Sequence, residues 1–240
     1  SMPYRILAIN PGSTTTKIAV YDDETPLFET TINHTREEFS SCADLVASLP
    51  IRKDAIEAEL QSHGISARSL SAVIGRGGLL RPIAGGTYTI NESMLSDLRS
   101  CKYGEHACNL GAMLADEIAR FVGVPAYIAD SVVTDELCPL ARLSGHPEIS
   151  RVSIFHALNQ KAEARRFCTS RGLKYEEVNL IVAHIGGGAT IGAHEKGRVI
   201  DVNDGLGGEG PYSAQRCGGL PANSLIKLCA KENLPATDMI

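Results

Sequence analysis

Tryptophan is absent from the 240 residues, and aromatic residues together make up only 5% of them. Aromatic side chains are the platforms on which single-stranded nucleic-acid bases stack, so this composition disfavours that class of protein. The formal net charge is −5 at pH 7, and no cluster of lysine and arginine offsets it. We therefore expect no nucleic-acid partner.

Long hydrophobic runs and paired cysteine motifs are also missing. No apolar run approaches the ~20 residues that a membrane-spanning helix needs, and the N-terminus has no signal-peptide pattern. Seven cysteines are scattered along the chain without any Cys-x-x-Cys spacing, which disfavours a disulfide framework and a zinc site. We expect a cytoplasmic protein with no membrane partner, whose cysteines serve as small buried hydrophobic residues.

The remaining composition is that of an ordinary globular protein, with 43% hydrophobic and 21% charged residues. Runs of β-forming residues between turn residues predict strands at 4–9, 17–21, 27–32, 71–74, 86–90, 125–129, 179–185, 189–194 and 197–202. The apolar strand at 179–185 is expected to be buried. Helices are predicted at 36–62 with a loop near Leu49-Pro50, and at 92–99, 106–122, 154–171 and 222–232.

A short internal repeat relates the two halves of the chain. The segment ILAINPGSTTTKIAV aligns with LIVAHIGGGATIGAH when Asn10 stands opposite His184, and Thr16 then stands opposite Thr190. Both copies read as strand, turn of small residues, strand, charged turn and third strand. Two such turns facing each other would offer backbone N–H groups and hydroxyls to a phosphate-sized anion. Each turn taken alone is equally consistent with an ordinary tight β-hairpin.

Two common nucleotide-binding motifs do not explain these turns. The segment NPGSTTTK lacks the second glycine that a P-loop places before its lysine, and a strand rather than a helix follows it. The triplet Gly186-Gly187-Gly188 leads into a predicted hairpin, whereas a dinucleotide fingerprint opens a helix. Because glycine weakens packing, the triplet still indicates that something approaches the backbone closely.

Several reactive side chains lie beside glycines or at strand ends. Arg76 in GRGG and Arg216 in QRCGG could each present a planar guanidinium to a carboxylate or phosphate. Either arginine alone is better explained as a surface residue of a turn. Asp130 ends a predicted strand, where a carboxylate often meets a cleft, although it could equally cap the next element.

Three histidines, His106, His156 and His184, neighbour apolar or glycine-rich segments. A core histidine bonded to a backbone carbonyl is the default for any one of them, and their spacing does not match a zinc site. The other four are expected in loops or on the surface: His34, His63, His146 and His194.

Taken together, these stretches resemble the acetate and butyrate kinases of the sugar-kinase, heat-shock-chaperone and actin superfamily, with butyrate kinases the nearer branch. The resemblance extends over nearly the whole chain and rests on INPGSTTTKIAVYDD, GRGGLL with GGTY, GEHACNLGA, SIFHALNQKAEARR, AHIGGGATIGAHEKGRVIDVN, and GEGP with QRCGGLP. It implies an α/β fold of duplicated ribonuclease H-like (actin-like ATPase) domains with mixed sheets flanked by helices. The first lobe would span 2–135, and an incomplete second lobe would span 136–240.

The resemblance also implies a reaction. The γ-phosphoryl group of ATP would pass, with Mg²⁺, to the carboxylate of butyrate or a similar short-chain or branched-chain fatty acid, in a homodimer or higher homo-oligomer. A carboxylate with a pKa of roughly 4 to 5 is already an anionic nucleophile, so alignment and charge neutralisation are needed rather than a general base. Relatives continue beyond Ile240, so a non-catalytic ATP-binding or assembly fragment remains an alternative.

Residue roles follow from the same resemblance. Catalytic roles are implied for Arg76, His156, Arg216 and Asp130. Substrate binding is implied for Arg76, Gly77, Gly78, His106 and Phe155. The ATP phosphates would be bound by Asn10, Ser13, Thr15, Lys17, His184, Gly186, Gly187 and Gly188, and the magnesium ion by Asp130 and Asn10. Acetate kinases carry bulky valines where Gly77 and Gly78 stand, so we expect a wider acyl pocket.

Overall fold

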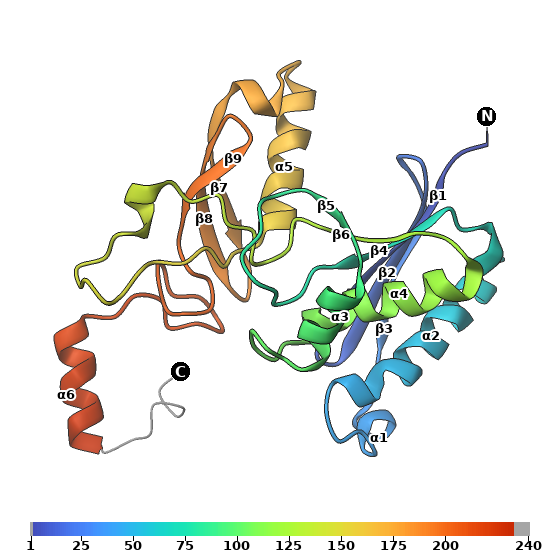
Figure 1. Ribbon diagram of the computed structural model, residues 1–240, viewed down its shortest axis with the longest axis horizontal. Coiled ribbons are helices and arrows are strands. Elements are labelled where there is room, and N and C mark those ends of the chain that lie inside the picture. The colour runs from blue at the N-terminus through green and yellow to red at the C-terminus, as the bar shows by residue number, and fades with distance from the viewer. Residues whose placement is uncertain (1, 233–240) are drawn as a thin grey trace. The chain divides into compact units, whose positions relative to one another are not determined.

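The computed structural model describes residues 2–232 (Figure 1) and divides the chain into two compact units, Ser1–Thr134 and Asp135–Ile240. They are called unit 1 and unit 2 below. Across residues 2–232, none of the helices combines the length and the apolar character that crossing a bilayer requires.

Unit 1 is built on a six-stranded mixed sheet in the order β3-β2-β1-β4-β6-β5. Strands β1, β2 and β3 form an antiparallel meander, β1, β4 and β6 run parallel to one another, and β5 is antiparallel to β6. The strands span Arg5–Pro11 (β1), Thr15–Asp22 (β2), Thr25–Asn33 (β3), Ala72–Arg76 (β4), Thr87–Thr89 (β5) and Ala126–Ala129 (β6). Parallel pairing requires crossover segments, and the helices between these strands supply them.

The helices of unit 1 are α1 (Arg36–Phe39), α2 (Leu49–Ser62), α3 (Glu92–Arg99) and α4 (Leu110–Val122). The loop predicted near Leu49-Pro50 is wrong, because these two residues begin α2. Proline is tolerated in a first helical turn, where the amide it lacks would have no intrahelical partner. The break in the predicted helix instead lies between α1 and the 3₁₀ turn Val46–Ser48.

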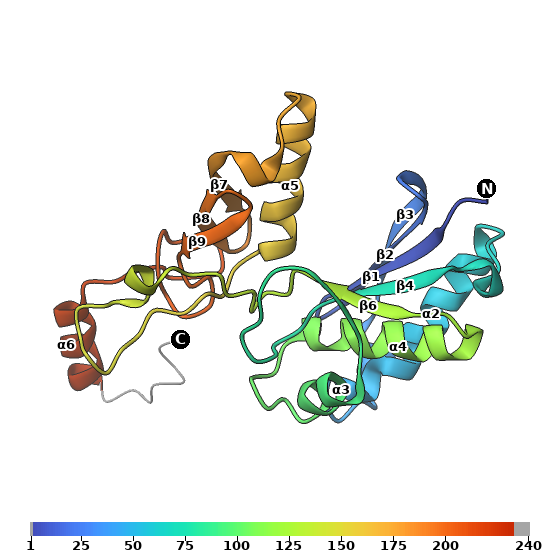
Figure 2. The same ribbon diagram turned by 45° about the horizontal axis from the view of Figure 1, so that its top comes forward.

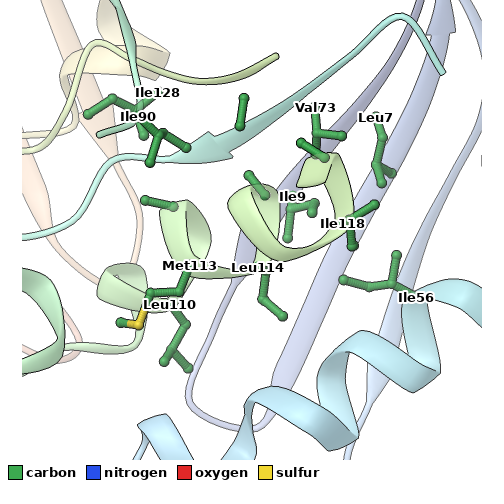
Figure 3. Packing of buried hydrophobic residues seen from close by; sticks show 14 of the residues in the cluster. Leu7, Ile9, Ile56, Val73, Ile90, Leu110, Met113, Leu114, Ile118 and Ile128 are labelled. Atoms are coloured by element: carbon green, nitrogen blue, oxygen red, sulfur yellow. The ribbon is translucent and has the colours of Figure 1, made fainter. Parts of the chain in front are cut away.

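The hydrophobic core of unit 1 lies between one face of the sheet and helices α2 and α4 (Figure 3). Alternate strand residues such as Leu7, Ile9 and Val73 point into it, as the period of two in a strand requires. Helix α4 contributes Leu110, Met113, Leu114 and Ile118, all fully buried. Phe121 continues the helical spacing of these apolar residues but is 65% exposed, with the Lys53 ammonium 5.7 Å from its ring centroid.

A backbone contact between two glycines sets the distance between α4 and β4. A Cβ atom on Gly75 would lie 2.2 Å from the carbonyl oxygen of Gly111, and one on Gly111 would lie 2.4 Å from that of Arg76. Only glycine permits this approach. The start of α4 is therefore held against the carboxyl end of β4.

Unit 2 contains a three-stranded antiparallel sheet, β7-β8-β9, with helix α5 along one face (Figure 2). Its elements are α5 (Ala157–Ser170), β7 (Asn179–Ile185), β8 (Ala189–Glu195), β9 (Arg198–Val202) and α6 (Ala222–Glu232). The predicted hairpin from β8 to β9 is confirmed. Its turn residues Lys196 and Gly197 both have positive φ, 47° and 83°, as a two-residue hairpin turn with the twist of its strands requires.

Strand β7 does not fit the prediction of a buried strand. It lies at the edge of the sheet, and Ile181 and Ile185 are 74% and 82% exposed. Its alternate residues Leu180 and Val182 pack against buried residues of α5. An apolar run predicts a strand, but it does not reveal how many of the strand's faces are covered.

The buried polar residues of unit 2 include a histidine that was predicted at the surface. His194 is 2% exposed, its Nδ1 lies 2.6 Å from the Tyr175 hydroxyl, and its Nε2 lies 2.9 Å from Oε1 of Gln160. Burial, followed by the positive charge of Lys161, lowers the pKa of His194 from 6.5 to about 4. His34 in unit 1 is buried as well, at 7% exposure, but it lies in the loop between β3 and α1, so the prediction of a loop or surface position is wrong only for His194.

The cysteines also differ in part from expectation. Cys108 and Cys168 are buried, and burial raises the pKa of the Cys108 thiol to about 11. Cys217 is exposed, and the other four are partly buried, so the expectation of buried hydrophobic residues holds for two of the seven. All seven are free thiols.

The pKa of His194 predicts how the stability of unit 2 depends on pH. Between pH 6.5 and about 4 this histidine is protonated in the unfolded chain but not in the folded one. The free energy of unfolding therefore falls as the pH decreases through this window, and above pH 6.5 His194 adds no pH dependence. The shift corresponds to at most ~3 kcal/mol. Urea unfolding at pH 7, 5.5 and 4.5 should show a smaller pH dependence for His194→Gln, whereas His146→Gln at an exposed histidine should keep the wild-type profile.

Candidate functional site

The turn between β1 and β2 is closed by a hydrogen bond from the amide of Gly12 to the carbonyl of Thr15, at 2.8 Å. Ser13 is exposed within it. The predicted phosphate-binding residues Ser13 and Thr15 therefore belong to the same turn. Lys17 does not, because it lies within β2, opposite Asn10 in register.

A buried arginine that the sequence analysis did not identify lies beneath this turn. Arg52 of α2 is 0% exposed and donates to the carbonyls of Thr15, at 2.8 Å, and Ser13, at 3.1 Å. It also donates to the hydroxyl of Thr16, at 3.2 Å. In a trans peptide the C=O and N–H groups point in opposite directions, so the amide of Thr14 points away from Arg52. The turn thus directs that amide outward, where an anion could accept from it.

Asn10 and Arg76 meet at the carboxyl edge of the parallel strands. Arg76 is the last residue of β4, and its Nη1 lies 3.4 Å from Oδ1 of Asn10 on β1. Both side chains lie on the face of the sheet opposite α2 and α4, since their neighbours Ile9 and Gly75 point toward the core. In open α/β sheets, ligands bind at this edge.

Asp130 lies at the same edge, directly after β6. Arg76 pairs with Ala129, which places Asp130 on the adjacent strand end. Its φ of 41° is rare for a residue with a side chain, and its Oδ1 accepts from the amide of Gly86 at 2.9 Å. A strained backbone held by its surroundings is common at functional sites. One carboxylate beside bound phosphates is also a usual protein contribution to a Mg²⁺ site, so Asp130 fits the predicted metal role.

Lys17 already has a partner in this structure. Its ammonium lies 2.8 Å from Oε1 of Glu29, and both side chains are about half exposed, at 50% and 53%. An exposed pair of this kind contributes on the order of 0–1 kcal/mol, so a phosphate could replace the carboxylate at small cost. Phosphate binding by Lys17 stays a prediction.

Gly77 and Gly78 are closely packed. A Cβ on Gly77 would lie 2.7 Å from Cβ of Ser131, and one on Gly78 would lie 2.6 Å from Oδ1 of Asn109 and 2.7 Å from Cδ2 of Leu98. These atoms belong to the interior of unit 1. Close packing inside unit 1 thus accounts for the two glycines, and the wider acyl pocket stays a prediction.

His106 begins the segment that leads into α4. Its Nδ1 accepts from the amide of Cys108 at 3.1 Å, which makes it the N-cap of a 3₁₀ turn, Ala107–Asn109. The ring is exposed. Capping accounts for a histidine at this position, and a role in substrate binding stays a prediction.

The turn between β7 and β8 consists of the three predicted glycines. The carbonyl of Gly187 accepts from the hydroxyl of Ser213, at 2.6 Å, and from the amide of Gln215, at 3.1 Å. The carbonyl of Arg216 in turn accepts from the amide of Ser213 at 2.9 Å. The glycine turn and the segment that carries Arg216 are thus joined in unit 2. A Cβ on Gly187 would lie 2.8 Å from Oε1 of Gln215, the end of an exposed side chain that can move aside, so packing does not account for glycine here.

His156 and His184 are stacked, with ring centroids 3.6 Å apart and an interplanar angle of 7°. His156 is the N-cap residue of α5, and a Cβ on Gly188 would lie 3.5 Å from its Cε1. Nδ1 of His184 lies 2.9 Å from Nδ2 of Asn159. Unit 2 therefore brings both predicted histidines to the glycine turn.

Phe155, the residue before His156, is placed differently. It is 3% exposed and packs in a cluster with Leu137, Ala157 and Val199. Core packing accounts for an aromatic residue here, and the predicted contact with substrate stays untested.

The register of the hairpin β1-β2 differs from that of the hairpin β7-β8 by one residue in the first strand, unlike in the sequence alignment. Thr16 pairs with Pro11, and Thr190 pairs with His184, so Pro11 rather than Asn10 is the counterpart of His184. Four residues separate Pro11 from Thr16 and five separate His184 from Thr190, so the second turn is one residue longer and the first strand of the alignment is displaced by one position. Because a shift of one residue reverses the face of the sheet, Asn10 and His184 are not equivalent. Thr16 and Thr190 do correspond, and both are 0% exposed.

Within residues 2–232 the predicted site residues thus form two groups, one in each unit. No group of three or more His, Cys, Asp or Glu side chains in that range is arranged to hold a metal ion by itself. Three buried residues next to these groups were not predicted as site residues from the sequence: Arg52, Gln160 and Thr190. The position of Thr190 opposite Thr16 in the repeat was the one available signal.

Removing the guanidinium beneath the first turn should destabilise unit 1. Arg52→Met keeps the apolar stem but removes the guanidinium that donates to the carbonyls of Ser13 and Thr15, of which Thr15 keeps the amide of Gly12, at an expected cost of about 3 kcal/mol. Urea unfolding measures this cost, and Arg68→Met at an exposed position should stay within about 0.5 kcal/mol of wild type. Equal stability of the two variants would contradict the role assigned to Arg52.

Adding a methyl group at Gly78 should also affect stability. Gly78→Ala forces a new atom against Asn109 and Leu98, so we expect a loss of about 1–3 kcal/mol. Gly145→Ala is the matched control, since no atom lies within 4 Å of its Cβ position. A fully stable Gly78→Ala variant with a changed preference among carboxylic acids would instead support a role for Gly78 in an acyl pocket.

No protein-family model matches the chain. Its fold is similar to the crystal structures of acetate kinase from Porphyromonas gingivalis (TM-score 0.73, 19% identity, 98% of this chain and 66% of that chain) and from Entamoeba histolytica (0.71, 17%, 95% and 63%). It is also similar to that of a propionate kinase from Francisella tularensis subsp. tularensis SCHU S4 (0.69, 18%, 98% and 66%). The chain spans about two thirds of the length of these proteins. The predicted α/β fold class, with a mixed sheet flanked by helices, is confirmed.

Proposed function

We propose that this chain carries the phosphoryl-transfer machinery of a carboxylate kinase, which transfers the γ-phosphoryl group of ATP to butyrate or a similar short-chain or branched-chain fatty acid. The observation that carries the proposal is the similarity of its fold, at TM-scores of 0.69 to 0.73, to acetate and propionate kinases. The grouping of Asn10, Arg76 and Asp130 at one sheet edge, and of His156, His184 and Arg216 around the glycine turn, supports it.

In the proposed reaction a carboxylate oxygen of the acid attacks the γ-phosphorus, the bond from that phosphorus to the β,γ-bridging oxygen breaks, and ADP and an acyl phosphate result. No proton has to be removed from the acid, because it is ionised at neutral pH. What the residues must supply is positive charge and hydrogen-bond donors around the transferring group. Arg76 and Arg216 would supply guanidiniums, and His156 an N–H donor.

The phosphates of ATP would bind to the two turns. In unit 1, Ser13, Thr15 and the outward amide of Thr14 are available, with Lys17 able to exchange Glu29 for a phosphate. In unit 2, His184 and the turn Gly186–Gly188 would contribute. A magnesium ion would be held by Asp130 with Asn10, and when bound it would neutralise charge on the β- and γ-phosphate oxygens.

The preference for butyrate over acetate rests on the sequence resemblance alone, since Gly77 and Gly78 are accounted for by packing. Assembly as a homodimer or higher homo-oligomer, and a cytoplasmic location, likewise belong to the proposal. A non-catalytic ATP-binding or assembly fragment is the second candidate. The observation that favours it is that the chain spans 66% and 63% of the acetate kinases that it resembles.

The two candidates are separated by an assay of the chain with ATP, Mg²⁺ and one acid at a time. Acyl phosphate trapped as the hydroxamate should form from butyrate, and Arg76→Ala should lower kcat/KM by about 10²-fold or more, because a charged group at the transferring phosphoryl is lost. Arg81→Ala, at an exposed arginine outside the site, is the matched control. If calorimetry shows ATP binding but no hydroxamate forms, the non-catalytic ATP-binding candidate is supported. If the chain shows neither ATP binding nor turnover, both the kinase and the ATP-binding candidate are overturned.

A further inference from the structure

Unit 2 contains a continuous chain of hydrogen-bonded side chains that ends at His156. It begins at Tyr175, passes through His194 and Gln160 to Thr190, and reaches Nδ1 of His156, which lies 2.9 Å from the Thr190 hydroxyl. The three middle residues are at most 2% exposed. Inside a protein such a chain has to satisfy every donor and acceptor, so the direction of each hydrogen bond can be derived.

The direction is set by one group that can only accept, the backbone carbonyl of Thr190. It lies 3.0 Å from the side-chain nitrogen of Gln160, so the NH₂ group of Gln160 must face Thr190. The amide oxygen of Gln160 then faces Nε2 of His194, which has to donate to it across 2.9 Å. A neutral His194 accepts at Nδ1 from the hydroxyl of Tyr175. Burial, which lowers the pKa of His194 to about 4, keeps it in this neutral form.

The other end of the chain follows from the same anchor. The NH₂ group of Gln160 also lies 2.9 Å from the hydroxyl oxygen of Thr190 and donates to it. The backbone amide of His156 points to that oxygen as well, at 3.4 Å. With its oxygen engaged as an acceptor, the hydroxyl of Thr190 donates its own proton to Nδ1 of His156. A neutral imidazole that accepts at Nδ1 carries its proton on Nε2.

We propose that Gln160 and Thr190 are positioning residues that hold His156 in the tautomer with the proton on Nε2. The inference rests on the proposed function for its catalytic meaning, because a donor at Nε2 is what a transferring phosphoryl oxygen needs. The geometry of the glycine turn agrees with it, since a Cβ on Gly188 would lie 3.9 Å from Nε2 of His156. The stacked His184 is oriented in the same sense, with Nδ2 of Asn159 donating to its Nδ1.

The tautomer can be measured on this chain by ¹⁵N NMR of the histidine rings, with His156→Gln to assign the signals. Wild type should show a protonated Nε2 and an accepting Nδ1 at His156. Thr190→Val removes the hydroxyl at nearly constant volume and should give a mixture of tautomers, whereas Thr190→Ser should keep the wild-type pattern. Phe167→Ala is the matched control, since it truncates an exposed side chain of the same helix that takes no part in the polar chain.

Turnover gives the second readout. By analogy with residues that orient metal-bound histidines, Thr190→Val should lower kcat by about tenfold or more with little change in KM, and Thr190→Ser should restore it. A wild-type His156 protonated at Nδ1, or an unchanged ring pattern in Thr190→Val, would overturn the proposal whether or not the chain turns over ATP. If the NMR spectra show the expected ring patterns but the chain forms no hydroxamate, the assignment of the tautomer stands and only the proposed function is rejected.

Discussion

In each unit the fold depends on a buried threonine at the start of the second hairpin strand, bonded to a buried polar side chain of a neighbouring helix. In unit 1 Arg52 of α2 donates to Thr16, and in unit 2 Gln160 of α5 donates to Thr190. Both helix side chains also bind backbone carbonyls of the hairpin, so each turn is fixed to a helix and not only to its own strands. Leaving such groups without a partner would cost about 1–3 kcal/mol each, which makes this arrangement strongly specified.

Each threonine also contacts a histidine, but the two histidines have different surroundings. Thr16 lies 2.8 Å from Nε2 of His34, which is buried against Phe39, and Thr190 lies 2.9 Å from Nδ1 of His156, which heads α5 beside the glycine turn. The same contact between a buried threonine and a histidine therefore contributes to packing in unit 1 and orients a candidate catalytic ring in unit 2. Glycine has two uses here as well, since Gly75 and Gly78 permit close packing, whereas the carbonyl of Gly187 joins the turn to the segment of Arg216.

Sequence patterns predicted the elements well where side-chain period and turn chemistry were clear. The meander β1-β2-β3, the helix α3 and the hairpin from β8 to β9 lie close to where β-forming runs, turn residues and helical spacing predicted them. The patterns failed where the answer depended on the rest of the fold. The burial of His34 and His194 was not predicted, because nothing local reveals a polar partner such as Thr16 or Gln160. The alignment of Asn10 with His184 failed because a turn one residue longer leaves almost no trace in a short repeat.

Local residue chemistry was sufficient to single out the segments in which arginines and histidines lie beside glycines, and their role in binding charge stays a prediction. It was also sufficient for the α/β class, because strand and helix periods are visible along the chain. The tertiary structure decided which way each group points. Burial of Gln160 against the carbonyl of Thr190 fixes a proton on one nitrogen of His156, and the packing of Asn109 and Leu98 fixes the need for Gly78. Contacts between residues distant in the chain cannot be derived from local pattern, because they exist only once the helices have packed against the sheets.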